Sequence, residues 1–256
     1  MSRLARSRKA RAGTDLVCEH VFRPLAHVVV VALLPLRVPP PAVVVASGAA
    51  GIAGAVELAR GHLVVAALVV QLKTVLDNAD GQLARLSGRV TAFGRYLDSE
   101  MDLLVNAALF AALWRYTGNG VAALVGFVAL TTVLSVNFNV ERLYRGAPAA
   151  WDGSVLGRVY GLVYGPQDRL VERFVEWRLR DALPEVRAAY HDRLTVSVLA
   201  NLGMSPQLLV FGVCVAVGRP LAFVWITVLE LGLVAVLALR RELLLRGFAP
   251  IQEEAL

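Results

Sequence analysis

Cysteine and charge are both scarce in this 256-residue sequence. Its two cysteines, Cys18 and Cys214, lie in a basic N-terminal segment and in an apolar run, so we expect free thiols and no disulfide framework. Only 18% of the residues are charged, and no nucleic-acid-binding motif accompanies the net charge of +6. Internal repeats and low-complexity tracts are also missing. These absences argue against a disulfide-stapled fold, a repeat architecture and a nucleic-acid partner.

Apolar residues are abundant instead. They make up 57% of the chain, and the mean hydropathy is +0.61, far above an average soluble domain. About 20 apolar residues are needed for one membrane-spanning helix, and windows of this kind recur along the chain. The sequence therefore predicts an all-α integral membrane protein with six transmembrane helices. The windows are Pro41–Leu58, His62–Leu76, Leu97–Trp114, Val121–Val140, Leu194–Val217 and Leu221–Leu239.

The N-terminal segment, residues 1–35, has a different character. Residues 14–34 mix Asp15, Glu19 and Arg23 with an apolar run that ends at Pro35. This pattern predicts an amphipathic helix at the membrane interface, with a short seventh span as an alternative. Prolines interrupt the apolar run and no small-residue cleavage site follows it, so we expect no removable signal peptide.

Arginines are distributed unevenly between the predicted loops. They are frequent before the first span, between the second and third, between the fourth and fifth, and after the sixth. The alternate loops contain only Arg60, Arg115 and Arg219. The positive-inside rule then places both termini and the loop that carries Arg85 in the cytoplasm, for a multi-pass protein of the cell membrane.

Residues 146–192 form the one long segment between predicted spans. Leu170, Val171, Phe174 and Trp177 recur near helical spacing among charged residues, which predicts a cytoplasmic amphipathic insertion. A basic loop at the lipid headgroups and a cover over an active site both remain open for it. We treat residues 1–256 as a single domain. The small residues of the first span, such as Gly51, predict close helix packing.

Four aspartates are concentrated around the second predicted loop. Asp77 and Asp80 lie three residues apart, and Asp98 and Asp102 lie four apart, so each pair shares one helix face. The short connection predicts an antiparallel hairpin in which the two faces meet. Carboxylate oxygens without His or Cys favour a hard divalent cation such as Mg²⁺ or Mn²⁺. Two such ions would form the clamp used for phosphoryl displacement. Salt bridges to loop arginines are the alternative.

The full spacing around these acids resembles the signature of the CDP-alcohol phosphotransferase family. It runs Asp77-x2-Asp80-Gly81-x2-Ala84-Arg85-x8-Gly94-x3-Asp98-x3-Asp102, with no element missing. One departure is visible at the start of the first span. Family members often carry Pro-Asn-x-x-Thr there, whereas this chain has Pro40-Pro41-Ala42-Val43-Val44, which puts a donor contact at that position in doubt.

The resemblance implies a reaction and roles for the motif residues. A hydroxyl acceptor would attack the phosphorus distal to cytidine in a CDP-alcohol, in phospholipid synthesis, and CMP would leave. The four aspartates would hold two metal ions, and Asp102 would also accept the proton of the hydroxyl. The residues expected to contact the donor are Gly81, Ala84, Arg85, Thr91 and Gly94. The resemblance also implies a homodimer among membrane lipids.

The substrates remain open at this stage. CDP-diacylglycerol is the expected donor, and a CDP-linked polar alcohol such as CDP-inositol is the alternative. The acceptor is expected to be a small polar alcohol or an alcohol phosphate, bound at the cytoplasmic helix ends by Arg142 and Arg193. Lys73, one turn before Asp77, is expected to pair with a carboxylate, with a substrate phosphate as the alternative. A cation-coupled transporter and a metal-dependent prenyl transferase are the rival classes, although neither explains the Gly81-x2-Ala84-Arg85 core.

Overall fold

The computed structural model describes residues 13–147 and 150–247, and within these ranges the chain contains helices and no strands. A short π-helix, η1 (Cys18–Phe22), leads into the first α-helix. The α-helices are α2 (Arg23–Leu33), α3 (Pro40–Ala59), α4 (Leu63–Leu86), α5 (Ala92–Thr117), α6 (Gly120–Tyr144), α7 (Val155–Val163), α8 (Gly165–Arg178), α9 (Pro184–Tyr190), α10 (Arg193–Ala200), α11 (Met204–Ala216) and α12 (Pro220–Gly247).

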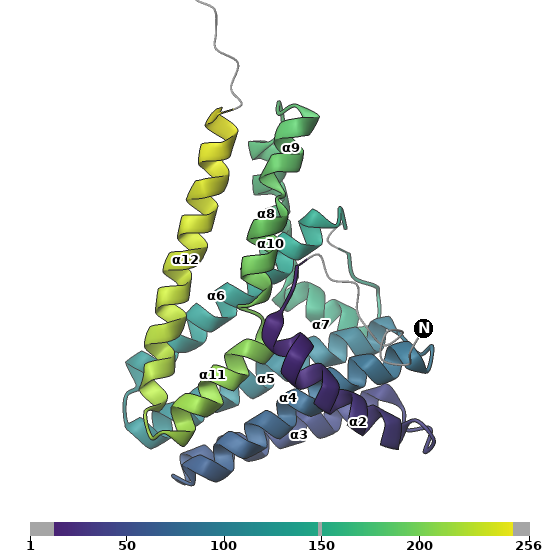
Figure 1. Cartoon of the computed structure of the whole chain (residues 1–256), viewed down its shortest axis with the longest axis vertical. Coiled ribbons are helices and arrows are strands. Elements are labelled where there is room, and N and C mark those ends of the chain that lie inside the picture. The colour runs from purple at the N-terminus through teal and green to yellow at the C-terminus, as the bar shows by residue number, and fades with distance from the viewer. Residues whose placement is uncertain (1–12, 148–149, 248–256) are drawn as a thin grey trace, which may run out of the picture.

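Helices α3, α4 and α5 form the centre of the packing, with α11 against α4 and α12 against α6 (Figure 1). Their contact is close because small residues face bulkier neighbours. A Cβ atom placed on Gly51 of α3 would lie 2.5 Å from Cγ1 of Val105 on α5, well inside van der Waals contact. The small-residue character of α3 thus fits the expected packing role, since it allows α5 to approach.

Four helical stretches are long and apolar enough to cross a bilayer, which indicates a multi-pass membrane protein. They are Pro40–Ala59, Gly120–Tyr144, Arg193–Ala216 and Pro220–Leu245. The two other predicted windows fall in α4 and α5. These helices extend beyond the predicted windows, α4 to Leu86 at its end and α5 from Ala92 at its start, and the motif aspartates within them reduce their apolar character.

The fifth predicted window is broken into two helices. The helix α10 ends at Ala200, and α11 begins at Met204 after Gly203. The side chain of Asn201 occupies the break, where its Oδ1 accepts from the Leu16 N–H at 3.0 Å and its Nδ2 donates to the Thr14 carbonyl at 2.8 Å. The break therefore ties the start of the described chain to the helix core, a long-range contact that local hydropathy cannot reveal.

The N-terminal segment packs on the bundle. In α2, Ala26 and Val30 are buried against Ala79 and Leu83 of α4, while Val28 on the opposite face is exposed. The helix is thus apolar on both its buried face and its exposed face. The predicted basic stretch at residues 1–12 lies outside the described residues.

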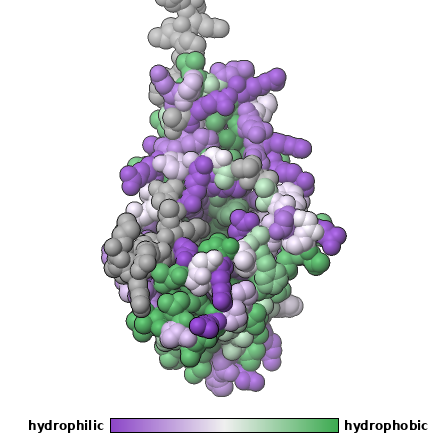
Figure 2. Space-filling model, turned by 90° about the vertical axis from the view of Figure 1, so that its right-hand side faces the viewer, coloured by the Kyte–Doolittle hydropathy of each residue, from purple (hydrophilic) through white to green (hydrophobic). Residues whose placement is uncertain are grey.

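In its described residues the segment 146–192 forms three helices, whereas the sequence predicted one amphipathic helix. The first, α7, packs on α5, and α8 and α9 extend beside α12 in the upper part of Figure 1. Arg178 of α8 donates to Glu242 of α12 at 2.7 Å. Figure 2 shows that this upper part is mainly hydrophilic on the face drawn, whereas hydrophobic residues gather in the lower part. The insertion therefore belongs to the polar end of the molecule.

Candidate active site

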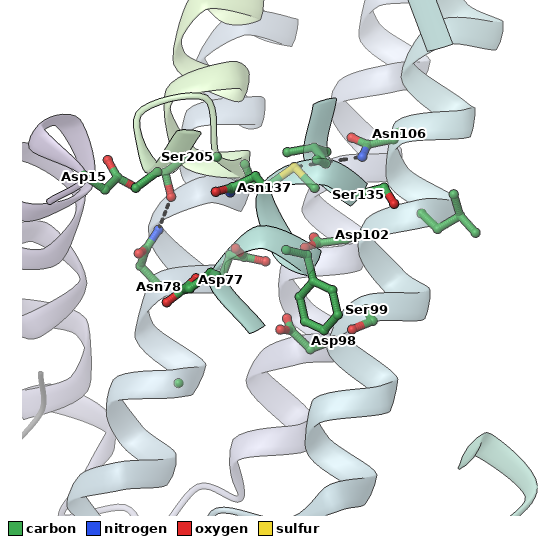
Figure 3. Close-up of a pocket in the computed structure, with 18 of the residues that line it drawn as sticks. Asp15, Asp77, Asn78, Asp98, Ser99, Asp102, Asn106, Ser135, Asn137 and Ser205 are labelled. Carbon is green, nitrogen blue, oxygen red and sulfur yellow. Dashed lines mark hydrogen bonds between the residues drawn. The ribbon is translucent and has the colours of Figure 1, made fainter. Parts of the chain in front are cut away.

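The hairpin of α4 and α5 brings the motif aspartates together. Carboxylate oxygens of Asp77, Asp98 and Asp102 all lie within 4.8 Å of one another (Figure 3). Asp80 lines the same cavity from α4 but does not belong to this group of three. Its Oδ2 is buried and has no hydrogen-bond partner among the described residues. Three of the four predicted ligands thus converge, and Asp80 borders the same cavity outside that group.

A cation is the natural partner for this arrangement. Burying a carboxylate oxygen without a partner is costly, and three adjacent carboxylates repel one another. The donor set is all-oxygen, which suits Mg²⁺ or Mn²⁺ better than softer ions. The residues present therefore fit the divalent metal expected from the sequence.

Lys73 supplies part of the positive charge. It is 1% exposed, its Nζ donates to Asp77 Oδ1 at 2.7 Å, and it also forms an ion pair with Asp102. The expected pairing of this lysine with a carboxylate is confirmed. Because it bridges α4 and α5, it orients two of the three clustered carboxylates.

The carboxylates border a cavity of about 390 Å³. Residues of α4, α5, α6 and α7 line it, together with Ser205 near the start of α11 and Asp15 near the start of the described chain. Such a volume is in the range of small-molecule sites. The acids therefore lie in the wall of a space large enough to hold part of a substrate.

Of the predicted donor residues, the structure brings two to the cavity. Gly81 and Arg85 both line it, and they lie one turn apart on α4. A Cβ on Gly81 would come within 3.2 Å of Nη1 of Arg85, so the glycine leaves the guanidinium room. Ala84, Thr91 and Gly94 are not among the lining residues. Thr91 instead caps α5, where its Oγ accepts from the Gly94 N–H at 3.1 Å.

Two tyrosines that the motif did not indicate lie in the cavity wall, Tyr160 in α7 and Tyr164 between α7 and α8. Tyr160 and Tyr164 line the cavity, and the Tyr164 hydroxyl donates to the Ser99 carbonyl at 3.1 Å. The Tyr160 ring packs on Tyr96 with a centroid distance of 5.2 Å. Burial raises the pKa of Tyr160 to about 12, so its phenol stays protonated and can donate a hydrogen bond. No sequence spacing linked these residues to the acids, which lie more than fifty positions earlier.

Arg142 and Arg193, the residues predicted to bind the acceptor, are not brought to the cavity. Arg142 is buried, and its Nη2 donates to the Asn139 Oδ1 at 3.0 Å and to the Asp168 carbonyl at 3.2 Å. Burial raises the pKa of Asp168, and a hydrogen bond from Asn139 opposes that rise. Arg193 is exposed at the start of α10. The guanidinium of Arg142 thus joins α6 to α8, and an acceptor contact by either arginine stays a prediction.

Glu230, an acidic residue within the last predicted span, has a partner in the bundle. Gln207 of α11 donates to its Oε2 at 2.5 Å. This bond links α11 to α12, and neither residue lies near the aspartates in sequence. We therefore attribute Glu230 to helix pairing.

Comparison with known proteins identifies a protein family whose model matches this chain. A family model described as CDP-alcohol phosphatidyltransferase matches residues 25–166, which include the motif, the hairpin and α7. A phosphatidylinositol phosphate synthase from Mycobacteroides abscessus is 33% identical over 115 residues, 44% of this chain and 52% of the relative. A bifunctional IPC transferase and DIPP synthase from Thermococcus kodakarensis is 36% identical over 86 residues, 33% of this chain.

These matches cover only part of each relative. The Thermococcus alignment spans 20% of that protein, and the Mycobacteroides alignment about half of the other. Among solved structures, the chain resembles a Mycobacterium tuberculosis phosphatidylinositol phosphate synthase with CDP-DAG bound. The identity is 22%, the TM-score is 0.40, and the match covers 79% of this chain and 94% of that one.

Proposed function

The chain belongs to the CDP-alcohol phosphatidyltransferase family, and we propose that it transfers a phosphatidyl group from CDP-diacylglycerol to a hydroxyl acceptor and releases CMP. The observation that carries this proposal is the gathering of Asp77, Asp98 and Asp102 beside a cavity that Gly81 and Arg85 also line. Family membership favours a transferase over the cation-coupled transporter and the prenyl transferase.

Divalent metal ions are part of the proposal, since the family is generally divalent-metal dependent and the acidic cluster fits them. We expect two ions, Mg²⁺ or Mn²⁺, held by Asp77, Asp80, Asp98 and Asp102. Bound there, divalent cations would neutralise charge on the diphosphate and on the attacking oxygen.

The protein's own groups then have separable tasks. Asp102 accepts the proton of the acceptor hydroxyl while the hydroxyl oxygen forms a bond to the phosphorus distal to cytidine. The phosphoanhydride bond to CMP breaks, and CMP leaves with the electron pair. Arg85 donates in a fork to oxygens of the diphosphate. Lys73 keeps Asp77 and Asp102 in place, and Tyr160 and Tyr164 cover one side of the cavity.

The proposed setting is the cytoplasmic membrane. We propose six spans, with α4 and α5 as the second and third, and the N-terminal segment at the interface. The arginine-rich loops, the insertion at 146–192 and the active site would face the cytoplasm. We also propose one domain over residues 1–256 and a homodimer, as the family resemblance implies.

A reconstitution experiment tests the function. The full chain is purified in lipid nanodiscs and offered CDP-diacylglycerol or CDP-inositol with a panel of hydroxyl acceptors, while CMP release and lipid products are followed. We expect CMP from CDP-diacylglycerol, no CMP in excess EDTA, and recovery with Mg²⁺ or Mn²⁺. CMP from CDP-inositol alone would identify the alternative donor. A lack of CMP with both donors would refute the transferase.

A further inference from the structure

Residues of α6, α8, α9 and α12 line a second cavity, which has a volume of about 320 Å³. No residue that lines it also lines the cavity of the motif aspartates. Along α6, Ser135 and Asn137 line the first cavity, whereas Val136 and Val140 line the second. The lining residues from α8, α9 and α12 lie outside residues 25–166, the part that the family model matches. The second cavity is therefore separate from the proposed active site.

The apolar part of this cavity lies near the ends of two stretches that are long enough to span a bilayer. Val136 and Val140 are in the last third of α6, and after Ala238 the apolar run of α12 reaches Arg240 within two residues. Phe174 and Trp177 of α8 also line the cavity, and both are exposed. Aromatic residues are enriched where the hydrocarbon core meets water. An acyl chain from the bilayer could enter the cavity at this level.

Arg241 supplies a polar group to the same cavity. Its side chain is 8% exposed, its Nε donates to the Tyr190 carbonyl at 2.8 Å, and its guanidinium carbon lies 4.0 Å from the centroid of the Tyr190 ring. Its Nη2 is buried and has no hydrogen-bond partner among the described residues. Burying a cationic donor without a partner is costly. An anionic oxygen in the cavity would remove that cost.

The acids near Arg241 have other partners. Asp192 and Glu242 both act electrostatically on the Arg241 guanidinium. Asp192 forms its ion pair with Arg240, and Glu242 forms one with Arg178 at 2.7 Å. Neither carboxylate is hydrogen-bonded to Arg241 within the described part of the chain. The free Nη2 therefore remains available for an oxygen that the protein itself does not supply.

We propose that this second cavity binds an anionic phospholipid of the surrounding bilayer, with its phosphate at Arg241 and an acyl chain against Val140 and Phe174. Arginine matches phosphate in fork geometry, and basic pockets between membrane helices on the cytoplasmic side bind anionic head groups. A free anion would leave the apolar wall uncovered, and a zwitterionic lipid would bring its own cation to a site that already holds arginines. The lipid would join α8 of the insertion to α6 and α12. This site goes beyond the transferase assignment and does not depend on it.

A lipid titration tests the proposal. The full chain is purified in detergent, stripped of lipid, and titrated with phosphatidylglycerol or phosphatidylcholine that carry the same acyl chains. Native mass spectrometry counts the lipids bound per chain and gives the mass of the assembly. We expect phosphatidylglycerol to bind about tenfold or more tightly than phosphatidylcholine. It should also raise the melting temperature, because it binds only the folded state.

Two variants locate the lipid. Arg241→Gln removes the guanidinium, and Ala238→Trp fills the cavity from an exposed position while Arg241 stays in place. Each should weaken phosphatidylglycerol binding about tenfold or more. Arg158→Gln is the matched control, because Arg158 is exposed on α7 and lines neither cavity, so the same loss of charge should leave the affinity unchanged. If Arg241→Gln does not fold, Ala238→Trp decides.

The other outcomes would overturn the proposal. Unchanged phosphatidylglycerol binding in either folded variant would place the lipid elsewhere. Equal affinity for the two lipids, or equal weakening in Arg158→Gln, would leave no specific anionic site. Inorganic phosphate that stabilised the protein as much as the lipid would assign Arg241 to a free anion. A lipid-free dimer that Ala238→Trp splits into monomers would show that a second copy covers the cavity. None of these measurements uses CMP release, so the transferase proposal is tested separately.

Discussion

At the scale of residues, the four motif aspartates occupy different environments. Asp77 and Asp102 share Lys73, Asp98 lies on the other side of the cluster, and Asp80 keeps a buried oxygen without a hydrogen-bond partner among the described residues. Asp102 is followed, a turn later on α5, by Asn106, which also lines the cavity. We assign the proton to Asp102 because the family resemblance implies that role, and its place in the cluster beside the cavity is compatible with it.

The first prediction separates Asp102 from Asp77. Asp102→Asn keeps an oxygen ligand but cannot accept a proton, so we expect metal and donor binding to survive while turnover falls roughly 10²-fold or more. Asp77→Ala should weaken metal and donor binding together. Calorimetry with the CDP donor at saturating Mg²⁺, combined with CMP release, measures both. An equal loss of donor binding in the two variants would leave Asp102 as a ligand only.

The second prediction concerns Lys73. Lys73→Met leaves Asp77 and Asp102 without their buried cation, and breaking a buried pair from one side costs about 3–5 kcal/mol. Mg²⁺ binds only the folded state. Added Mg²⁺ should therefore raise the melting temperature of the variant by more than it raises that of the unaltered protein.

The control for Lys73 is an exposed ion pair. Arg60 pairs with Glu57 at 2.9 Å, and its side chain is 63% exposed. Arg60→Met should therefore change stability by less than about 1 kcal/mol. If Lys73→Met lowered the melting temperature equally with Mg²⁺ and with EDTA, the lysine would not be compensating the metal-site acids.

At the scale of elements, the site depends on how closely α3 and α5 pack and on where α4 ends. The sequence placed Asp77 and Asp80 at the end of a short span, but α4 continues to Leu86. Hydropathy windows end where charge begins, whereas the backbone hydrogen bonds of a helix continue regardless of side-chain polarity. The acids therefore lie inside the bundle, where neighbouring helices hold them.

The third prediction tests the close approach of α3 to α5. In Gly51→Ala the new Cβ would lie 2.5 Å from Cγ1 of Val105, so the helices must shift, at a cost of about 1–3 kcal/mol. Gly232→Ala on α12 is the matched control, because its Cβ meets no atom within 4 Å and alanine favours a helix. Thermal unfolding in detergent compares them. Val105→Ala added to Gly51→Ala should recover stability, and a failure to do so would contradict this packing.

At the scale of the whole molecule, the arginine-rich loops and the hydrophilic upper part should lie on one side of the membrane. The insertion α7–α9 belongs to that part and also supplies tyrosines to the cavity. Soluble substrates would then reach the site from the side where arginines concentrate.

The fourth prediction tests this orientation. Val121 is 76% exposed near the turn between α5 and α6, and Arg89 is exposed in the turn between α4 and α5. In intact cells a membrane-impermeant maleimide should label Val121→Cys from outside, but Arg89→Cys only after permeabilisation. The native Cys18 and Cys214 are buried and serve as the background. The reverse pattern would invert the proposed topology.

The sequence by itself determined the family, the apolar helical character and the spacing that puts each aspartate pair on one helix face. These properties are local: periodicity, hydropathy and short spacings are readable within some twenty-six residues. Tertiary structure decided the rest. The pairing of Lys73 with Asp102, the contact of Tyr164 with Ser99 and the break at Asn201 join residues far apart in the chain. Such contacts depend on how whole helices pack, which no local pattern encodes.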